Sequence, residues 1–80
     1  MNEMTKAFMD MPIEELKEFV NANEQTSFAE DSKVRMFLNK YDERFAKKEP
    51  GYGLPFAFVH MYVELSNALY QRLVNSSAGK

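Results

Sequence analysis

Residues 55–75 read PFAFVHMYVELSNALYQRLVN, and this stretch decides the fold class. At about 100° per residue, a helix here gathers one apolar face: Phe58, Tyr62, Leu65, Leu69 and Leu73. The opposite face is polar: His60, Glu64, Asn67 and Gln71. The β-forming residues between 56 and 63 allow a strand as the competing interpretation. The periodicity that continues to Leu73, and the proline at the start, favour a helix.

The same segment carries a second apolar stripe beside the first. Its members are Phe56, Val59, Val63, Tyr70 and Val74. A helix with two apolar stripes needs more than one neighbour. Either the helix is the central element of the domain, or the second stripe is a partner or dimer surface. The heptad-like spacing would suit a homodimer through this helix, although a three-helix domain requires only the first explanation.

Two further helices are predicted upstream. Ser27 and Glu30 have the form of a capping box, and an apolar series at helical spacing follows. The series is Val34, Phe37, Leu38, Tyr41 and Phe45. Pro12 and the acidic residues after it mark an earlier helix start, and Met4 and Phe8 suggest a short helical turn before that.

These signals predict an all-α fold. We expect a compact three-helix bundle with helices at about 11–22, 28–48 and 55–75, preceded by the short N-terminal turn. The loop at 50–53 is short, so the two long helices should form an antiparallel pair. The chain should be a single small domain over 1–80 with a frayed tail at about 76–80.

Charge is unevenly distributed along the chain. Residues 1–31 hold eight acidic and two basic side chains, residues 32–48 hold two acidic and six basic, and the total is −2. Such segregation suggests a surface that meets a partner. One candidate contact surface is a basic stripe on the second predicted helix: Lys33, Lys40, Arg44 and Lys47. A candidate acidic docking face lies on the first: Glu14, Glu15 and Glu18.

Each charged surface has more than one interpretation. The basic stripe could follow a nucleic-acid backbone, but the acidic composition and the lack of an aromatic recognition motif count against it. It could equally be a solvated flank that faces the acidic helix, or a contact for an acidic protein. The acidic face could imitate the charge of a nucleic acid or dock on a basic protein, or it could simply favour solubility.

No motif for chemistry is present. The chain has no cysteine, so thiolate nucleophiles, thiolate metal sites and disulfides are excluded. His60, the single histidine, has Glu64 one turn away, and two ligands make a poor metal site. The serines have no motif around them, and Gly51 and Gly53 do not form a phosphate-binding loop. We therefore predict no enzyme activity, no cofactor and no metal.

The remaining expectations concern compartment and function. No apolar run approaches the roughly twenty residues of a membrane helix, and no cleavable signal is visible. With the absence of cysteine, this favours the cytoplasm. The favoured function is a small non-enzymatic protein–protein interaction module: a modulator, an inhibitor or an accessory subunit of a larger complex. The alternative is a nucleic-acid-binding accessory protein that uses the basic stripe.

Overall fold

The structure, a computed structural model, describes residues 2–23, 25 and 28–78, with side chains as far as residue 76. This part of the chain forms helices and contains no strand, so the all-α prediction is confirmed, including the helix over 56–63. The helices are α1 (Glu3–Asp10), α2 (Ile13–Val20), α3 (Lys33–Tyr41), α4 (Glu43–Ala46) and α5 (Leu54–Ala78). The three-helix bundle with an antiparallel pair of long helices is not confirmed.

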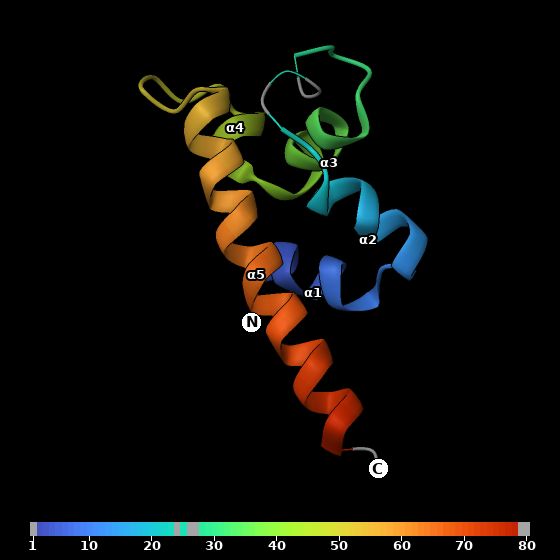
Figure 1. The fold of residues 1–80 in the computed structure, drawn as a ribbon. Coiled ribbons are helices and arrows are strands. Elements are labelled where there is room, and N and C mark those ends of the chain that lie inside the picture. The colour runs from blue at the N-terminus through green and yellow to red at the C-terminus, as the bar shows by residue number, and fades with distance from the viewer. Residues whose placement is uncertain (1, 24, 26–27, 79–80) are drawn as a thin grey trace.

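Helix α5 sets the shape of the molecule. Helices α1 to α4 gather along one side of it, and its last turns extend beyond them (Figure 1). Twenty-five helical residues span about 37 Å, which accounts for most of the 45 Å longest dimension. Its main packing partner is α1.

The N-terminal half largely follows the sequence signals. The expected short turn is a two-turn helix, α1, capped by Asn2, whose side-chain oxygen accepts from the Thr5 backbone N–H at 2.7 Å. The helix expected over 11–22 is α2, with Pro12 at its N-cap and Asn21 at its C-cap. Both helices are short, and packing on the core must supply most of their stability.

The helix predicted over 28–48 is wrong, because the chain breaks it twice. Residues 28–32 are not helical, and α3 begins after Ser32, whose hydroxyl accepts from the Arg35 N–H at 3.2 Å. Ser27, the predicted cap, lies outside the described residues. At Asp42 the backbone is extended (φ −101°, ψ 100°), and its carboxylate accepts from the Phe45 N–H at 3.3 Å to start α4. Aspartate suits this position because its side chain competes for backbone N–H groups.

The core joins all the longer helices. Rings of Phe8 on α1, Phe19 on α2 and Phe37 on α3 meet with centroids 4.6–5.4 Å apart. Helix α5 closes this cluster with five buried side chains: Ala57, Phe58, Met61, Leu65 and Ala68. The two alanines bring the α5 backbone close to its neighbours.

Two assignments on α5 are corrected by this packing. Leu73, expected in the core, is 69% exposed, because no other helix accompanies the last turns of α5. Glu64, expected on the polar face, is only 9% exposed, because α1 packs over it. The buried face of α5 is therefore rotated from the predicted one toward Ala57, Met61 and Ala68.

Candidate functional site

The polar side chains on the inner side of α5 bind the ends of other helices. Arg72 donates to the Phe8 and Met11 carbonyl oxygens at 3.0 and 2.7 Å, which satisfies the C-terminal end of α1. Tyr62 donates to the Ala22 carbonyl oxygen at 2.5 Å, just beyond the end of α2. These bonds use side chains that could otherwise have contacted a partner.

Glu64 is bound at the opposite end of α1. Its carboxylate accepts from the Thr5 hydroxyl at 2.7 Å, from the Asn2 side-chain amide, and from Asn67 at 3.3 Å. The Thr5 hydrogen bond is the main reason that the pKa of Glu64 lies below its ordinary value, and it outweighs the opposing effect of burial. Glu64 is thus an ionised structural group beneath α1.

A second polar cluster joins α4, the following loop and α5. Tyr52 donates to Asp42 Oδ2 at 2.5 Å, and His60 Nδ1 lies 3.3 Å from the same oxygen and 3.2 Å from the tyrosine oxygen. Burial first, and then the bond to Asp42, raise the pKa of the Tyr52 phenol. His60 therefore contacts a buried aspartate that the sequence analysis did not connect with it; only the i, i+4 spacing to Glu64 was visible.

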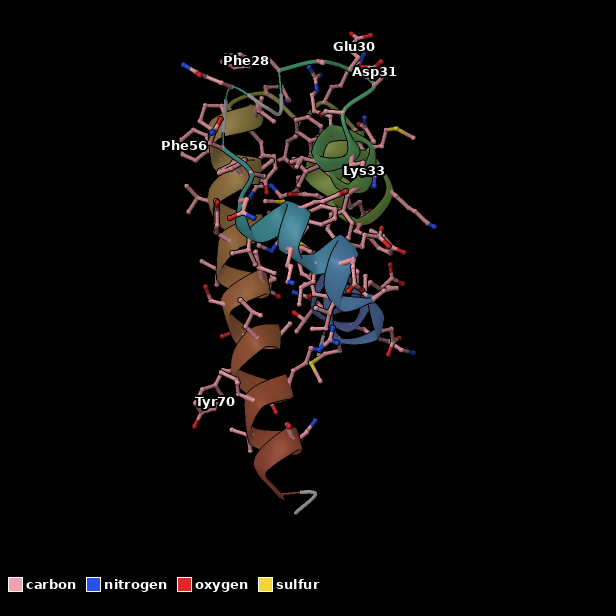
Figure 2. All side chains as sticks on the ribbon, turned by 45° about the vertical axis from the view of Figure 1, so that its right-hand side comes forward. Phe28, Glu30, Asp31, Lys33, Phe56 and Tyr70 are labelled. Carbon is pink, nitrogen blue, oxygen red and sulfur yellow. The ribbon has the colours of Figure 1, made fainter. Side chains whose placement is uncertain are left out.

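The outer face of α5 is apolar and uncovered. All five members of the predicted second stripe are exposed, together with Leu73. Their exposed fractions are 63% for Phe56, 62% for Val59, 52% for Val63, 67% for Tyr70, 69% for Leu73 and 43% for Val74. Phe56 and Tyr70 project from the side of α5 away from the other helices (Figure 2). These six residues form the outer face of α5, which is not part of the core.

No charged side chain interrupts the outer face. Apart from His60, which contacts Asp42, the acidic and basic residues of α5 are Glu64 and Arg72, and both turn inward to α1. At roughly 200 Å² for an aromatic side chain and roughly 150 Å² for a branched aliphatic one, the exposed fractions amount to on the order of 600 Å². That is the upper end of the largest apolar patch on an ordinary monomer, about 300–600 Å². An uncharged apolar patch at this end of the range is often functional.

The basic stripe is mostly neutralised within the chain. Lys33 pairs with Glu18 at 2.7 Å, and Lys47 pairs with Glu43 at 2.6 Å. Arg44 forms two bonds to Glu49, at 2.9 and 3.0 Å, and its guanidinium lies 4.4 Å above the centre of the Tyr52 ring. Lys40 lies 5.3 Å from the centre of the Tyr41 ring. The stripe also spans two helices, because the chain breaks at Asp42.

The acidic face is exposed on α2, as its polar pattern predicts. Glu14, Glu15 and Glu18 are all exposed, and Glu18 holds Lys33. The acidic and basic segments therefore meet at this ion pair. Such a surface pair contributes about 0–1 kcal/mol, so it orients α2 and α3 only weakly.

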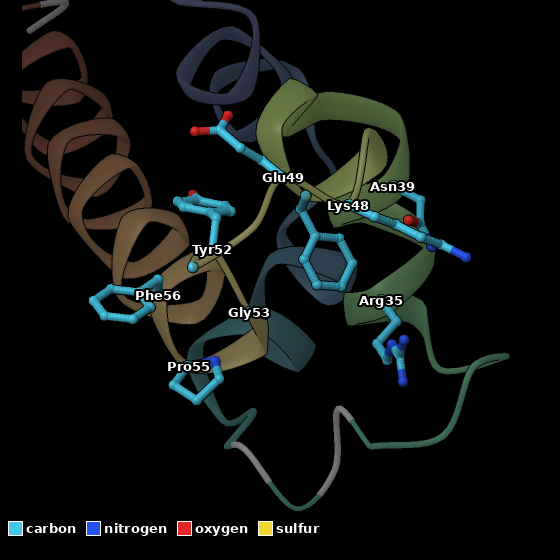
Figure 3. A pocket seen from close by; sticks show the side chains of 10 residues that line it. Arg35, Asn39, Lys48, Glu49, Tyr52, Gly53, Pro55 and Phe56 are labelled. Atoms are coloured by element: carbon cyan, nitrogen blue, oxygen red, sulfur yellow. The ribbon is translucent and has the colours of Figure 1, made fainter.

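An open hollow lies beside the start of α5. It has a volume of about 590 Å³ and is bounded in part by Arg35, Lys48, Tyr52 and Phe56 (Figure 3). Tyr52 stacks on Phe56 with ring centroids 6.5 Å apart. The hollow is open, and it continues the outer face around the first turn of α5.

Among residues 2–23, 25 and 28–78, no three His, Asp or Glu side chains lie close enough together to hold a metal ion. No helix that the structure describes combines the length and apolarity needed to cross a bilayer.

Comparison of the chain with protein-family models, with curated proteins and with solved structures finds no match.

Proposed function

We propose that the protein is a small non-enzymatic protein–protein interaction module, a modulator or accessory subunit of a larger assembly, and that the outer face of α5 is its binding surface. The observation that carries this proposal is the continuous apolar, uncharged outer face, exposed along most of a 25-residue helix. Interface cores are depleted of charge and enriched in aromatic residues. Phe56 and Tyr70 supply the aromatic anchors.

Nucleic-acid binding is the weaker candidate. Three of the four basic-stripe residues, Lys33, Arg44 and Lys47, are engaged with carboxylates of the chain itself. Binding a phosphate backbone would require these pairs to open, and nothing in the geometry of the stripe favours that. We therefore treat nucleic-acid binding as an outcome of the test.

Two charge-matched variants test the proposal. Val63→Asp places a carboxylate in the middle of the outer face, where Val63 is 52% exposed. Ile13→Asp places the same charge on a branched aliphatic residue that is 47% exposed at the start of α2, away from α5. Exposed substitutions of this kind change the free energy of unfolding by about 0.5 kcal/mol or less. Both variants should therefore remain folded.

The measurement is a pull-down from an extract of the source of the protein. Wild type and both variants serve as tagged baits, each with and without nuclease, and captured copies of the chain itself are excluded from the count. We expect wild type and Ile13→Asp to capture one protein in stoichiometric amount, with or without nuclease. Val63→Asp should not capture it. Equal capture by Val63→Asp would overturn the assignment to the outer face. Capture that vanishes with nuclease would favour the basic stripe.

A further inference from the structure

The spacing of the outer face has the form of a two-helix seam. Positions 56, 59, 63, 66, 70 and 73 alternate steps of three and four residues, which is the heptad pattern of paired helices. Five of these positions are apolar, and Ser66 is the exception. The core-facing Met61 and Ala68 occupy the position opposite to the seam in each heptad. One helix thus presents two opposite apolar sides, of which α1 to α4 cover only one.

We propose that a second copy of the chain covers the outer face, through an antiparallel pairing of the two α5 helices. This inference rests on the proposed function, because it concerns the same face: the second copy covers it in the isolated protein, and the partner of the larger assembly takes its place.

Area and access both suit a second copy. Two outer faces together would remove on the order of 1,200 Å² from water, which is the lower end of stable interfaces at about 1,200–2,000 Å². Helices α1 to α4 lie on the other side of α5, so they do not block the approach of a second α5 (Figures 1 and 2).

Charge also suits a second copy. The chain carries a net charge of only −2, so the repulsion between two copies is weak and screened by salt. The outer face is uncharged, and its contact adds no like-charge pair. A strongly basic or acidic partner would gain nothing from this face.

The sizes of the seam residues select the antiparallel direction. An antiparallel pair centred between Glu64 and Leu65 places Phe56 against Leu73 of the second copy, Val59 against Tyr70, and Val63 against Ser66. Every layer except the first then pairs a larger side chain with a smaller one, as a well-packed seam requires. A parallel pair would instead stack Tyr70 on Tyr70 and Ser66 on Ser66, which gives one overfilled layer and one underfilled layer.

Cysteine cross-linking tests both the occupant and the direction, because the chain has no cysteine of its own. Val59→Cys and Tyr70→Cys are made as separate single variants at exposed positions, and Met36→Cys, 59% exposed on α3, is the control. Melting curves first establish that all three are folded. Each variant is then oxidised alone and in equimolar mixture at about 50 µM, a concentration at which a micromolar dimer is mostly formed.

We expect disulfide dimers in the mixture of Val59→Cys with Tyr70→Cys, identified by mass as mixed pairs, and few from either variant alone. In the antiparallel pair, residue 59 of each copy lies about 16 Å along the axis from residue 59 of the other, too far for a disulfide. Cross-links from each variant alone would establish a parallel pair and overturn the antiparallel proposal. Cross-linking no greater than that of Met36→Cys would overturn the second copy itself.

The cross-linking and the pull-down together distinguish a failure of this inference from a failure of the proposed function. No specific cross-link, together with Val63-dependent capture of another protein, would overturn the second copy and retain the interaction module. Mixed cross-links without any Val63-dependent capture would retain the dimer and overturn the role as a modulator of another assembly.

Discussion

Single buried polar groups hold α5 in place on the rest of the molecule. Thr5 and Asn2 bind Glu64 near the start of α1, and Arg72 binds the carbonyl oxygens at its end. Buried carboxylates are costly unless they are hydrogen-bonded. The orientation of α5, and with it the direction of its outer face, therefore depends on these few contacts.

The Glu64 contact makes stability depend on pH. Its pKa is lower in the folded chain than its ordinary value of 4.5. The stabilisation is thus fully present above about pH 4.5 and is lost as the pH falls through the folded-state pKa. We expect the free energy of unfolding to fall more steeply below pH 4.5 in wild type than in Glu64→Gln, measured by urea denaturation. Parallel pH curves would contradict this assignment.

The hydroxyl of Thr5 is the main donor in that site. Thr5→Val keeps the shape of the side chain and removes the donor, and hydrogen bonds to charged groups contribute about 1.5–3 kcal/mol. We expect a loss of that order at pH 7 by chemical denaturation and a smaller loss at an acid pH below the folded-state pKa of Glu64. Thr5→Ser, which restores the hydroxyl, should recover most of the stability. An equal loss from Thr5→Val at both pH values would show that packing alone is responsible.

Tyr52 has the corresponding role at Asp42. Because the pKa of its phenol is raised, the tyrosine remains a donor through neutral and mildly alkaline pH. Tyr52→Phe leaves a carboxylate whose side chain is 2% exposed without its closest donor. We expect a destabilisation of about 1–3 kcal/mol in a denaturant titration. A change below about 0.5 kcal/mol, the range of an ordinary surface substitution, would show that His60 is sufficient.

For single residues, the helical periodicity predicted the exposed or buried state of a side chain only where that state depends on its own helix. The spacing of the second stripe identified an apolar face, but the polar position of Glu64 on the helical wheel suggested solvent. Its burial depends on Asn2 and Thr5, which lie 62 and 59 positions away in the sequence. Periodicity within one helix contains no information about such distant contacts.

Among the elements, the break at Asp42 has the largest consequence for the surface. It divides the expected long helix into α3 and the single-turn α4, and it turns the chain toward the loop that leads to α5. The apolar series from Val34 to Phe45 continues through the break, so periodicity alone predicted one helix. The signal that could have located the break is Asp42 itself, an N-cap residue followed by Glu43 in a first turn.

Two loop residues between α4 and α5 have a positive φ, which glycine adopts more easily than other residues do. Lys48 has φ 55° and Gly51 has φ 81°, and both values lie in the left-handed region that non-glycine residues enter at a cost. We expect Lys48→Gly to be neutral or to stabilise the fold by up to about 1 kcal/mol. Gly51→Ala, with open space around the added carbon, should destabilise it by about 1 kcal/mol.

Thermal melting tests both expectations: Lys48→Gly should melt at or above the wild-type temperature, and Gly51→Ala below it. Circular dichroism at a wavelength that reports helix is sufficient, because most of the described residues are helical. A Lys48→Gly variant that melts well below wild type would contradict the expected sign and point to a role for the lysine side chain.

For the whole molecule, the decisive feature is that α5 is longer than the body it packs against. Arg72 makes the last hydrogen bonds from α5 to the other helices, and Leu73 beyond it is 69% exposed. A single helix of this length exposes apolar surface at its end without gain to its own fold. The excess length is explained if a second chain lies along it.

Truncation separates folding from association. A chain of residues 1–72 retains the buried α5 side chains and the hydrogen bonds of Arg72 to α1, so its melting temperature in dilute solution should stay within a few degrees of wild type, as expected for a change of about 0.5 kcal/mol. It lacks Leu73, which the antiparallel pair places against Phe56 of the second copy. We expect weaker self-association by light scattering. A large fall in melting temperature would show that the last turns stabilise the monomer.

The all-α class, the start of α5 and its second apolar stripe were predictable from spacing alone, whereas its end was not, because the helix continues to Ala78 through part of the expected frayed tail. Which of the two apolar sides is covered was not predictable either, because both sides have similar composition. The outcome depends on α1, whose small size left little signal, and on the alanines at 57 and 68, which permit its close approach. These contacts join segments about sixty residues apart.

The central claim is that the outer face of α5 binds another protein chain, in the first instance its own copy. Sedimentation equilibrium of wild type and Val63→Asp from about 1 to 100 µM tests it most directly, because mass action must shift a reversible dimer over this range. We predict a wild-type mass that rises from 9.3 kDa toward twice that value, with Val63→Asp remaining at the monomer mass and Ile13→Asp following wild type. A wild-type mass of 9.3 kDa throughout would contradict self-association, and a dimer unaffected by Val63→Asp would place its interface elsewhere.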